Sequence, residues 1–171
     1  MVRIINDEKW APVIGKLFIA FGTIEGCVNT LLKEWCSAKT FAHVIADPLE
    51  RRVSLLKSLA FEQNIGEHNR EVLIVNLNDV LAIATTRNLI AHNPLVMTIY
   101  LDDASNPALL EVVRSERSEK TIEFDKLVAI GNRAKRLADA LSQNSIDLKM
   151  HGVTNAFVAD GRPHEAHAER A

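Results

Sequence analysis

Positive charge and cysteine are both scarce in this 171-residue chain. Its 20 lysines and arginines are outnumbered by 22 aspartates and glutamates, so the formal net charge is −2. A protein that coats nucleic acid is usually basic, so any contact with nucleic acid must come from a local patch. Cys27 and Cys36 fall on one expected helix, where roughly 13 Å of axis and half a turn separate them, too far for a disulfide. Two thiols that cannot pair favour a reducing, cytoplasmic location.

Several patterns that carry chemistry are also missing. The sequence has no glycine-rich phosphate loop, no Cys-x-x-Cys pair and no serine in a nucleophile-elbow context. We therefore expect neither a cofactor nor a metal ion. A metal site would be the alternative for His151, His164, Glu165 and His167, but they fall in an expected tail with no helix to hold their spacing. We favour disorder there.

No long hydrophobic run is free of polar residues. The apolar stretch 11–32 comes nearest to a membrane span, but Lys16, Glu25 and Asn29 interrupt it, and residues 1–10 lack a signal-peptide n-region. We expect a core helix there, with no targeting segment and no membrane partner.

What is present is helical periodicity. A capping Asn6 followed by Asp7 and Glu8 predicts the start of a helix of about 28 residues with one apolar face. A second strip of that helix holds only small residues, which let another backbone approach closely despite the low helix propensity of glycine: Ala11, Gly15, Gly22 and Gly26. The partner is either a neighbouring helix, which we favour, or a second copy of the chain.

Three further helices and a β segment follow. Asp47 as N-cap, with Pro48 in the first helical position, predicts a second helix. A third begins around Glu67 and ends near His92, before Pro94, and a last one covers about 125–145. Between them, residues 95–124 have the β-branched and aromatic character of a hairpin or three short strands.

These elements predict a mainly α protein. We expect an antiparallel up-and-down helical bundle with a small β insertion between the third and last long helices. Residues 1–148 would form a single domain, and residues 149–171 a flexible tail.

The stretch "TTRNLIAHNPL", residues 85–95, places polar side chains in an apolar run. Asn88 and His92 share a helix face within about 20° of Leu81, on what we interpret as the inward stripe, and the long Arg87 side chain lies on the flank. A helix cap is the alternative for His92 or Asn93 alone. The combination is harder to explain that way, because a buried Asn88 needs hydrogen bonds.

The six residues from Arg87 to His92 resemble the signature of the HEPN superfamily, an arginine, a polar residue and a histidine four to six positions beyond the arginine. In that family the motif lies near the end of a helix in an α-helical bundle. The resemblance covers roughly residues 7–146, and the 95–124 insertion departs from the minimal bundle.

The resemblance implies a metal-independent endoribonuclease whose two motifs face each other across a homodimer. Catalysis would then rest on Arg87, Asn88 and His92, with histidine moving protons and arginine binding the phosphate. RNA would be cut to 2′,3′-cyclic phosphate and 5′-hydroxyl ends. A toxin or defence effector is implied, with an antitoxin protein as a candidate partner. Two basic clusters could supply the RNA contact: Arg51, Arg52 and Lys57, and Arg133, Lys135 and Arg136.

Two alternatives stay open. One is a non-catalytic HEPN-like module that binds a nucleotide or a protein. The other is a helical scaffold in which the polar cluster only caps its helix. In that last case the His92 side chain should bond carbonyls of its own helix, away from any cleft.

Overall fold

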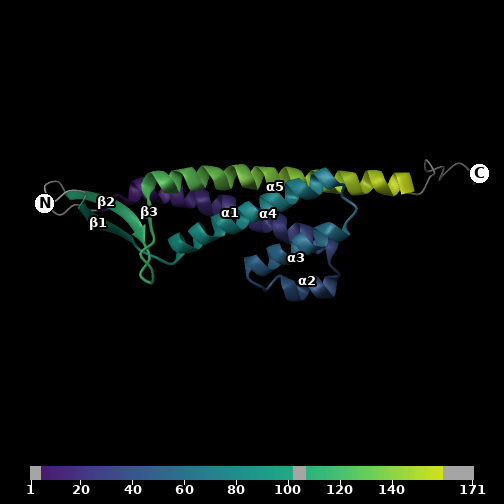
Figure 1. Ribbon diagram of the computed structural model, residues 1–171, viewed down its shortest axis with the longest axis horizontal. Coiled ribbons are helices and arrows are strands. Elements are labelled where there is room, and N and C mark those ends of the chain that lie inside the picture. Colours follow the sequence, from purple (N-terminus) through teal and green to yellow (C-terminus); the bar gives the residue numbers. More distant parts are fainter. Residues whose placement is uncertain (1–4, 102–106, 160–171) are drawn as a thin grey trace, which may run out of the picture.

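The computed structural model describes residues 5–101 and 107–159, and side chains within 5–99 and 110–149. The elements of this part are α1 (Asp7–Trp35), α2 (Ala38–Val44), α3 (Leu49–Glu62), α4 (Glu67–Ala91), β1 (Leu95–Leu101), β2 (Pro107–Arg114), β3 (Thr121–Glu123) and α5 (Phe124–Ala159). The sheet lies at one end of the long helices, and α2 and α3 lie under the other (Figure 1). The expected helical bundle with a three-strand insertion is confirmed.

Helix α1 begins where its capping signal predicts. The Asn6 side chain accepts a hydrogen bond from the Lys9 amide at 3.1 Å. Glu111 of β2 then fixes this end of the helix to the sheet, because its carboxylate accepts from the Trp10 indole at 2.9 Å and from the Asn6 amide at 3.0 Å.

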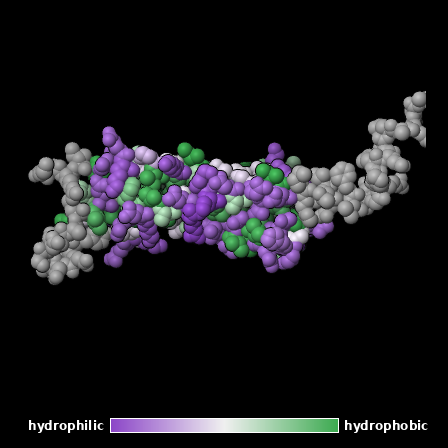
Figure 2. All heavy atoms as spheres, turned by 90° about the horizontal axis from the view of Figure 1, so that it is seen from above, coloured by the Kyte–Doolittle hydropathy of each residue, from purple (hydrophilic) through white to green (hydrophobic). Residues whose placement is uncertain are grey.

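The core lies between the inward faces of α1, α4 and α5. Its largest fully buried side chains include Trp10, Leu17, Ile24, Leu31, Leu73, Leu77, Leu127 and Leu141. Helix α1 is long and apolar enough to cross a membrane, a test that the core helix of a soluble protein also passes. Seen from the side of α5, hydrophilic side chains cover much of the described surface and hydrophobic ones show between them (Figure 2).

Two details of the first connection differ from the prediction. The structure adds the short helix α2, whose N-cap Ser37 accepts from the Thr40 amide at 3.1 Å. Seven residues are too few to display a clear apolar period. Helix α3 starts one residue late, with Pro48 rather than Asp47 as its N-cap. The Asp47 carbonyl instead accepts from Arg52 Nε at 3.1 Å.

The predicted end of the last helix near residue 145 was wrong, because α5 continues to Ala159. Its inward stripe passes from Leu141 to Asn144 and Leu148, and all three are buried. Asn144 is tolerated there because its side-chain oxygen accepts from Asn76 Nδ2 of α4 at 2.9 Å. Residues 149–159 of the expected tail therefore belong to α5, while 160–171 lie outside the described residues.

The sheet connects α4 to α5 directly. Its order is β1-β2-β3, antiparallel throughout, with Leu95 opposite Val113 and Val113 opposite Ile122. Strand β1 starts after Pro94, and α5 follows β3 without a loop. The insertion therefore lies beside the C-terminal end of α4, where the motif is.

Candidate functional site

The motif occupies the last turn of α4. The His92 amide donates to the Asn88 carbonyl at 3.2 Å, and His92 is the C-cap residue. Pro94 has no amide hydrogen and cannot continue the helix. The end of α4, and with it the position of the motif, follows from this local sequence.

Arg87 is the motif residue on the inward side of α4. It is half-buried, and its Cζ lies 4.9 Å from the centroid of the Phe21 ring and 5.5 Å from that of Phe18, both on α1. Its Nη1 donates to Asn88 Oδ1 at 3.0 Å. Its Nε is buried without a hydrogen-bond partner. The two rings and the amide hold the guanidinium in one place.

Asn88 and His92 are exposed, so their predicted place on the buried stripe was wrong. The predicted inward stripe was centred on Leu81, which is only half-buried. The buried stripe runs instead through Leu77 and Ala84. From Ala84 that stripe continues to Arg87, three residues on. The adjacent, exposed face carries Thr85, Asn88 and His92.

The side chain of Asn93 caps the C-terminal end of α4. Its Nδ2 donates to the Leu89 carbonyl at 2.7 Å, and its Oδ1 accepts from the Glu116 amide at 3.1 Å. Asn93 thus closes the helix and ties it to the loop between β2 and β3. The His92 imidazole, by contrast, makes no hydrogen bond or ion pair within the described residues.

The structure brings two of the three predicted site residues into contact. Arg87 and Asn88 are hydrogen-bonded side chain to side chain. His92 lies one turn after Asn88 on the same face, and no hydrogen bond joins it to either residue within the described chain. A single copy therefore presents an arginine–amide pair with a separate, freely exposed imidazole.

A cavity of about 500 Å³ adjoins this face, and no pattern in the sequence predicts it. It is lined by Thr85, Thr86, Leu89, Ser118, Lys120, Thr121, Ile122 and Lys126. These residues come from α4, the β2–β3 loop, β3 and the first turn of α5. Hairpin geometry brings them together, so no local motif could have indicated the cavity.

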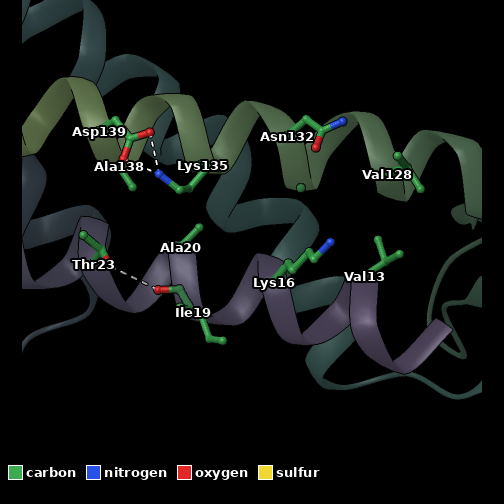
Figure 3. A pocket seen from close by; sticks show the side chains of 11 residues that line it. Val13, Lys16, Ile19, Ala20, Thr23, Val128, Asn132, Lys135, Ala138 and Asp139 are labelled. Atoms are coloured by element: carbon green, nitrogen blue, oxygen red, sulfur yellow. Dashed lines mark hydrogen bonds and ion pairs between the residues drawn. The ribbon is translucent and has the colours of Figure 1, made fainter. Parts of the chain in front are cut away.

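A second cavity of about 510 Å³ lies between α1 and α5. Figure 3 shows Val13, Lys16 and Ala20 of α1 facing the α5 residues Val128 and Asn132, whereas Ile19 points away from α5.

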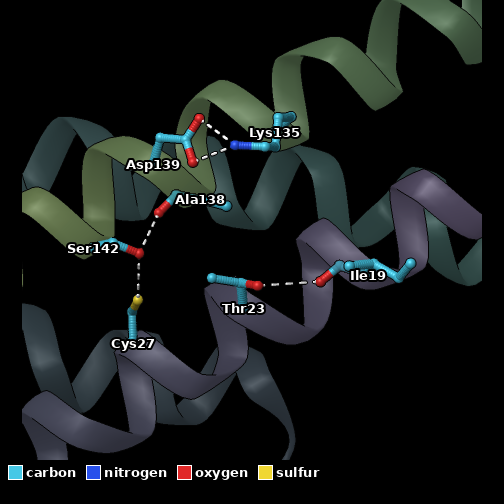
Figure 4. A network of polar contacts seen from close by, with 7 residues as sticks. All are labelled: Ile19, Thr23, Cys27, Lys135, Ala138, Asp139 and Ser142. Carbon is cyan, nitrogen blue, oxygen red and sulfur yellow. Dashed lines mark hydrogen bonds and ion pairs between the residues drawn. The ribbon is translucent and has the colours of Figure 1, made fainter.

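Most polar groups near this α1–α5 cavity are already paired (Figure 4). Lys135 Nζ donates to Asp139 Oδ2 at 2.6 Å. Ser142 donates to the Ala138 carbonyl at 2.8 Å and lies 3.5 Å from Cys27 Sγ. Only the Ser142–Cys27 contact joins α5 to α1, the others lie within α5, and we assign all of them a structural role.

Five of the six side chains in the two basic clusters are already paired within the chain, and Arg136 is the one that makes no ion pair within the described residues. Arg52 is buried, and its Nη1 donates to Asn29 Oδ1 at 2.5 Å. Lys57 donates to Asn78 Oδ1 at 2.6 Å, and Arg133 pairs with Asp79 at 2.6 Å. Side chains already bonded within the chain are poor candidates for binding phosphates.

Among the described residues, no three histidine, cysteine or acidic side chains gather in a way that could hold a metal ion. The tail histidines His164 and His167, with Glu165, lie outside the described residues, as does the side chain of His151.

Comparison with known proteins adds no relative. No family model matches the chain, and no curated protein or solved structure does either.

Proposed function

We propose that this chain is a metal-independent endoribonuclease of HEPN type, acting as a homodimer in the cytoplasm. The observation that carries the proposal is the state of the motif. Arg87 is fixed over two aromatic rings and bonded to Asn88, while the His92 side chain is exposed and unpartnered. A motif that only capped its helix would use the histidine on its own carbonyls, and that role belongs to Asn93.

The residue types fit the chemistry. The 2′-hydroxyl of RNA attacks the adjacent phosphorus, the bond to the 5′-oxygen breaks, and the products carry 2′,3′-cyclic phosphate and 5′-hydroxyl ends. One His92 takes the proton of the 2′-hydroxyl, and the His92 of the second copy gives a proton to the leaving oxygen. Arg87 stabilises the charge on the phosphate, and Asn88 holds Arg87 in position.

The homodimer is supported by an open face of α1, defined by Glu8, Ala11, Gly15, Ile19, Gly22, Gly26, Thr30 and Lys33. These residues lie within about 50° of a common direction at 100° per residue. A Cβ added at Gly15, Gly22 or Gly26 would meet nothing within 4 Å, and Ile19 is 75% exposed. Packing within the chain, which we favoured for the glycine strip, is therefore wrong for these three positions, and a second copy becomes the better partner.

The open face of α1 is complementary to itself when antiparallel. One register places Ile19 opposite Gly22 of the second copy and Gly15 opposite its Gly26, so that a large side chain meets a gap. The same register sets Glu8 opposite Lys33, two opposite charges. Arg87, which lies over Phe18 and Phe21, then sits level with the two-fold axis in both copies.

The experiment is RNA cleavage in EDTA at matched dimer concentration. We expect the wild type to cut, and Arg87→Ala and His92→Ala to lose a factor of about 10²–10⁴. His43→Ala, which removes an exposed histidine on α2, is the matched control and should cut like the wild type. Equal cutting by His92→Ala and the control would refute the assignment.

A second candidate is a HEPN-like module that binds a nucleotide or a protein without cutting. One observation favours it: Arg87 already gives one donor to Asn88, and His92 does not meet it within one chain. Tight nucleotide binding that Arg87→Ala abolishes, with no cleavage of any RNA, would select this alternative. A toxin or defence role, with an antitoxin protein as partner, is part of the ribonuclease proposal and not of this alternative.

A further inference from the structure

The cavity beside the motif is lined by two lysines, four residues with hydroxyl groups and the apolar Leu89 and Ile122, and by no carboxylate. Lys120 and Lys126 are both exposed, and neither makes an ion pair within the described residues. Of the two lysines that line the α1–α5 cavity, Lys135 is paired with Asp139 and Lys16 makes no ion pair within the described residues. The cavity beside the motif is therefore electropositive and open to an anionic ligand.

Its hydroxyl groups are also available. Thr86, Ser118 and Thr121 line the cavity, and their side chains make no hydrogen bond within the described chain. Thr85 differs, because its hydroxyl donates to the Leu81 carbonyl at 3.2 Å. Two ammonium groups and three free hydroxyls can all donate, which suits a ligand rich in acceptor oxygens.

Acidic side chains do occur on the same loop. Glu116 and Glu119 are exposed, and neither lines the cavity. The Glu116 amide is bonded to Asn93, so this loop is anchored to the end of α4 next to the motif. The anchor fixes the cavity relative to His92.

The cavity and the motif form one continuous surface. Thr85 lines the cavity and shares the exposed face of α4 with Asn88 and His92. Thr85 and His92 are seven residues apart, about 10 Å along the helix. A short stretch of a single RNA strand can therefore contact both the cavity and the motif.

We propose that this cavity is a phosphate subsite, in which Lys120 and Lys126 hold the backbone of an RNA strand a few nucleotides from the phosphate that faces the motif. The strand's identity as the cleaved RNA rests on the proposed function, whereas the phosphate chemistry rests on the cavity itself. An acceptor-rich, sequence-independent backbone fits donors of this kind. It also explains how a chain of net charge −2 obtains a local positive patch.

Binding of RNA that cannot be cut tests this subsite separately from catalysis. The probe is a fluorescent single-stranded RNA with 2′-O-methyl groups throughout, titrated with the full chain and followed by anisotropy at several salt concentrations. We expect Lys120→Gln/Lys126→Gln to weaken binding about tenfold at low salt. The slope of log K against log salt should fall by roughly 0.7–1.4.

The matched control is Lys39→Gln/Lys149→Gln, which removes two exposed cations that line neither cavity, from α2 and from the later part of α5. It should bind like the wild type, and thermal melting checks that both variants fold. Equal binding by the two double variants would overturn the subsite.

A second titration separates the sources of the phosphate. If adenosine 5′-monophosphate binds in a lysine-dependent way and the modified RNA does not, the cavity takes free nucleotides and the strand proposal is wrong. Lysine-dependent RNA binding by a chain that cuts nothing would keep the subsite and reject the nuclease. If Lys120→Gln/Lys126→Gln cuts RNA and binds the modified RNA as tightly as the wild type, the nuclease proposal is kept and the subsite is rejected.

Discussion

Arg87 and His92 belong to one motif, yet the fold needs them to different degrees. Arg87 covers Phe18 and Phe21 and bonds Asn88, so it contributes to packing as well as to any chemistry. His92 contributes only its backbone amide to the helix end. The motif thus contains an arginine with a structural role and a histidine whose side chain has no partner within the described residues.

This difference gives a stability prediction. His92→Ala should leave the free energy of unfolding within about 0.5 kcal/mol of the wild type, because the imidazole has no partner. Arg87→Ala should lower it by about 1–2 kcal/mol, through loss of the contacts with two rings. Urea denaturation measures both. A large loss for His92→Ala would mean that its side chain is structural, and its effect on cleavage would then say little about catalysis.

The residue scale is also where sequence reasoning failed most clearly. The spacing of Asn88 and His92 was correct, but the direction of the face was not, because periodicity alone cannot say which of two adjacent stripes is buried. Leu81 has the spacing of a fully buried residue, but in the structure it is only half-buried. The unpaired Nε of Arg87 depends on the surrounding side chains and has no sequence signal.

At the scale of elements, α1 performs two tasks on two faces. Its inward face carries the core, and its open face meets nothing in the chain at three glycines. Helix propensity alone would select against Gly15, Gly22 and Gly26, since each glycine costs about 1 kcal/mol relative to alanine. A close partner outside the chain gives those residues a physical reason.

The open face of α1 can be tested with one substitution that separates folding from association. Gly22→Leu should raise the free energy of unfolding of the single chain by about 1 kcal/mol, because the new side chain meets open space and improves helix propensity. In the proposed dimer the same side chain would fill the gap opposite Ile19, so Gly22→Leu should shift the chain to monomer. Light scattering after size exclusion measures the shift, with Ala140→Leu on α5 as the control.

The charges at the ends of this face provide an independent check. Glu8→Lys places like charges opposite each other and should weaken the dimer, whereas Glu8→Lys/Lys33→Glu restores opposite charges and should recover it. A Gly22→Leu protein that stays dimeric, or a double swap that recovers nothing, would place the interface elsewhere.

Element boundaries show what local signals can provide. The start of α1 at Asn6 and the end of α4 before Pro94 are set by caps and breakers, and both were predictable. The end of α5 was not, because Asn144 interrupts the apolar stripe and its partner Asn76 lies on another helix. A buried polar pair becomes visible only once the two helices are placed together.

At the scale of the whole molecule, the sheet explains how the candidate site is assembled. It fills one end of the bundle, where β3 leads into α5 and the β2–β3 loop is tied to Asn93 (Figure 1). The expected insertion was confirmed, but its effect could not be foreseen. Lys120 and Lys126 line the same cavity as Thr85 because the sheet folds back beside the end of α4. The position of the motif at the end of α4 could therefore be predicted from the sequence, whereas the cavity beside it could not.

The chemical identity of the product ends tests the proposed ribonuclease activity most directly. A short RNA is incubated with the full chain in EDTA, beside a copy of the same RNA with a single 2′-deoxy nucleotide at the mapped cut, and both are examined by mass spectrometry. We predict 2′,3′-cyclic phosphate and 5′-hydroxyl ends from the RNA, and no cut at the deoxy position. Cleavage at the deoxy position, or 5′-phosphate ends, would contradict attack by the 2′-hydroxyl and with it the role given to Arg87 and His92.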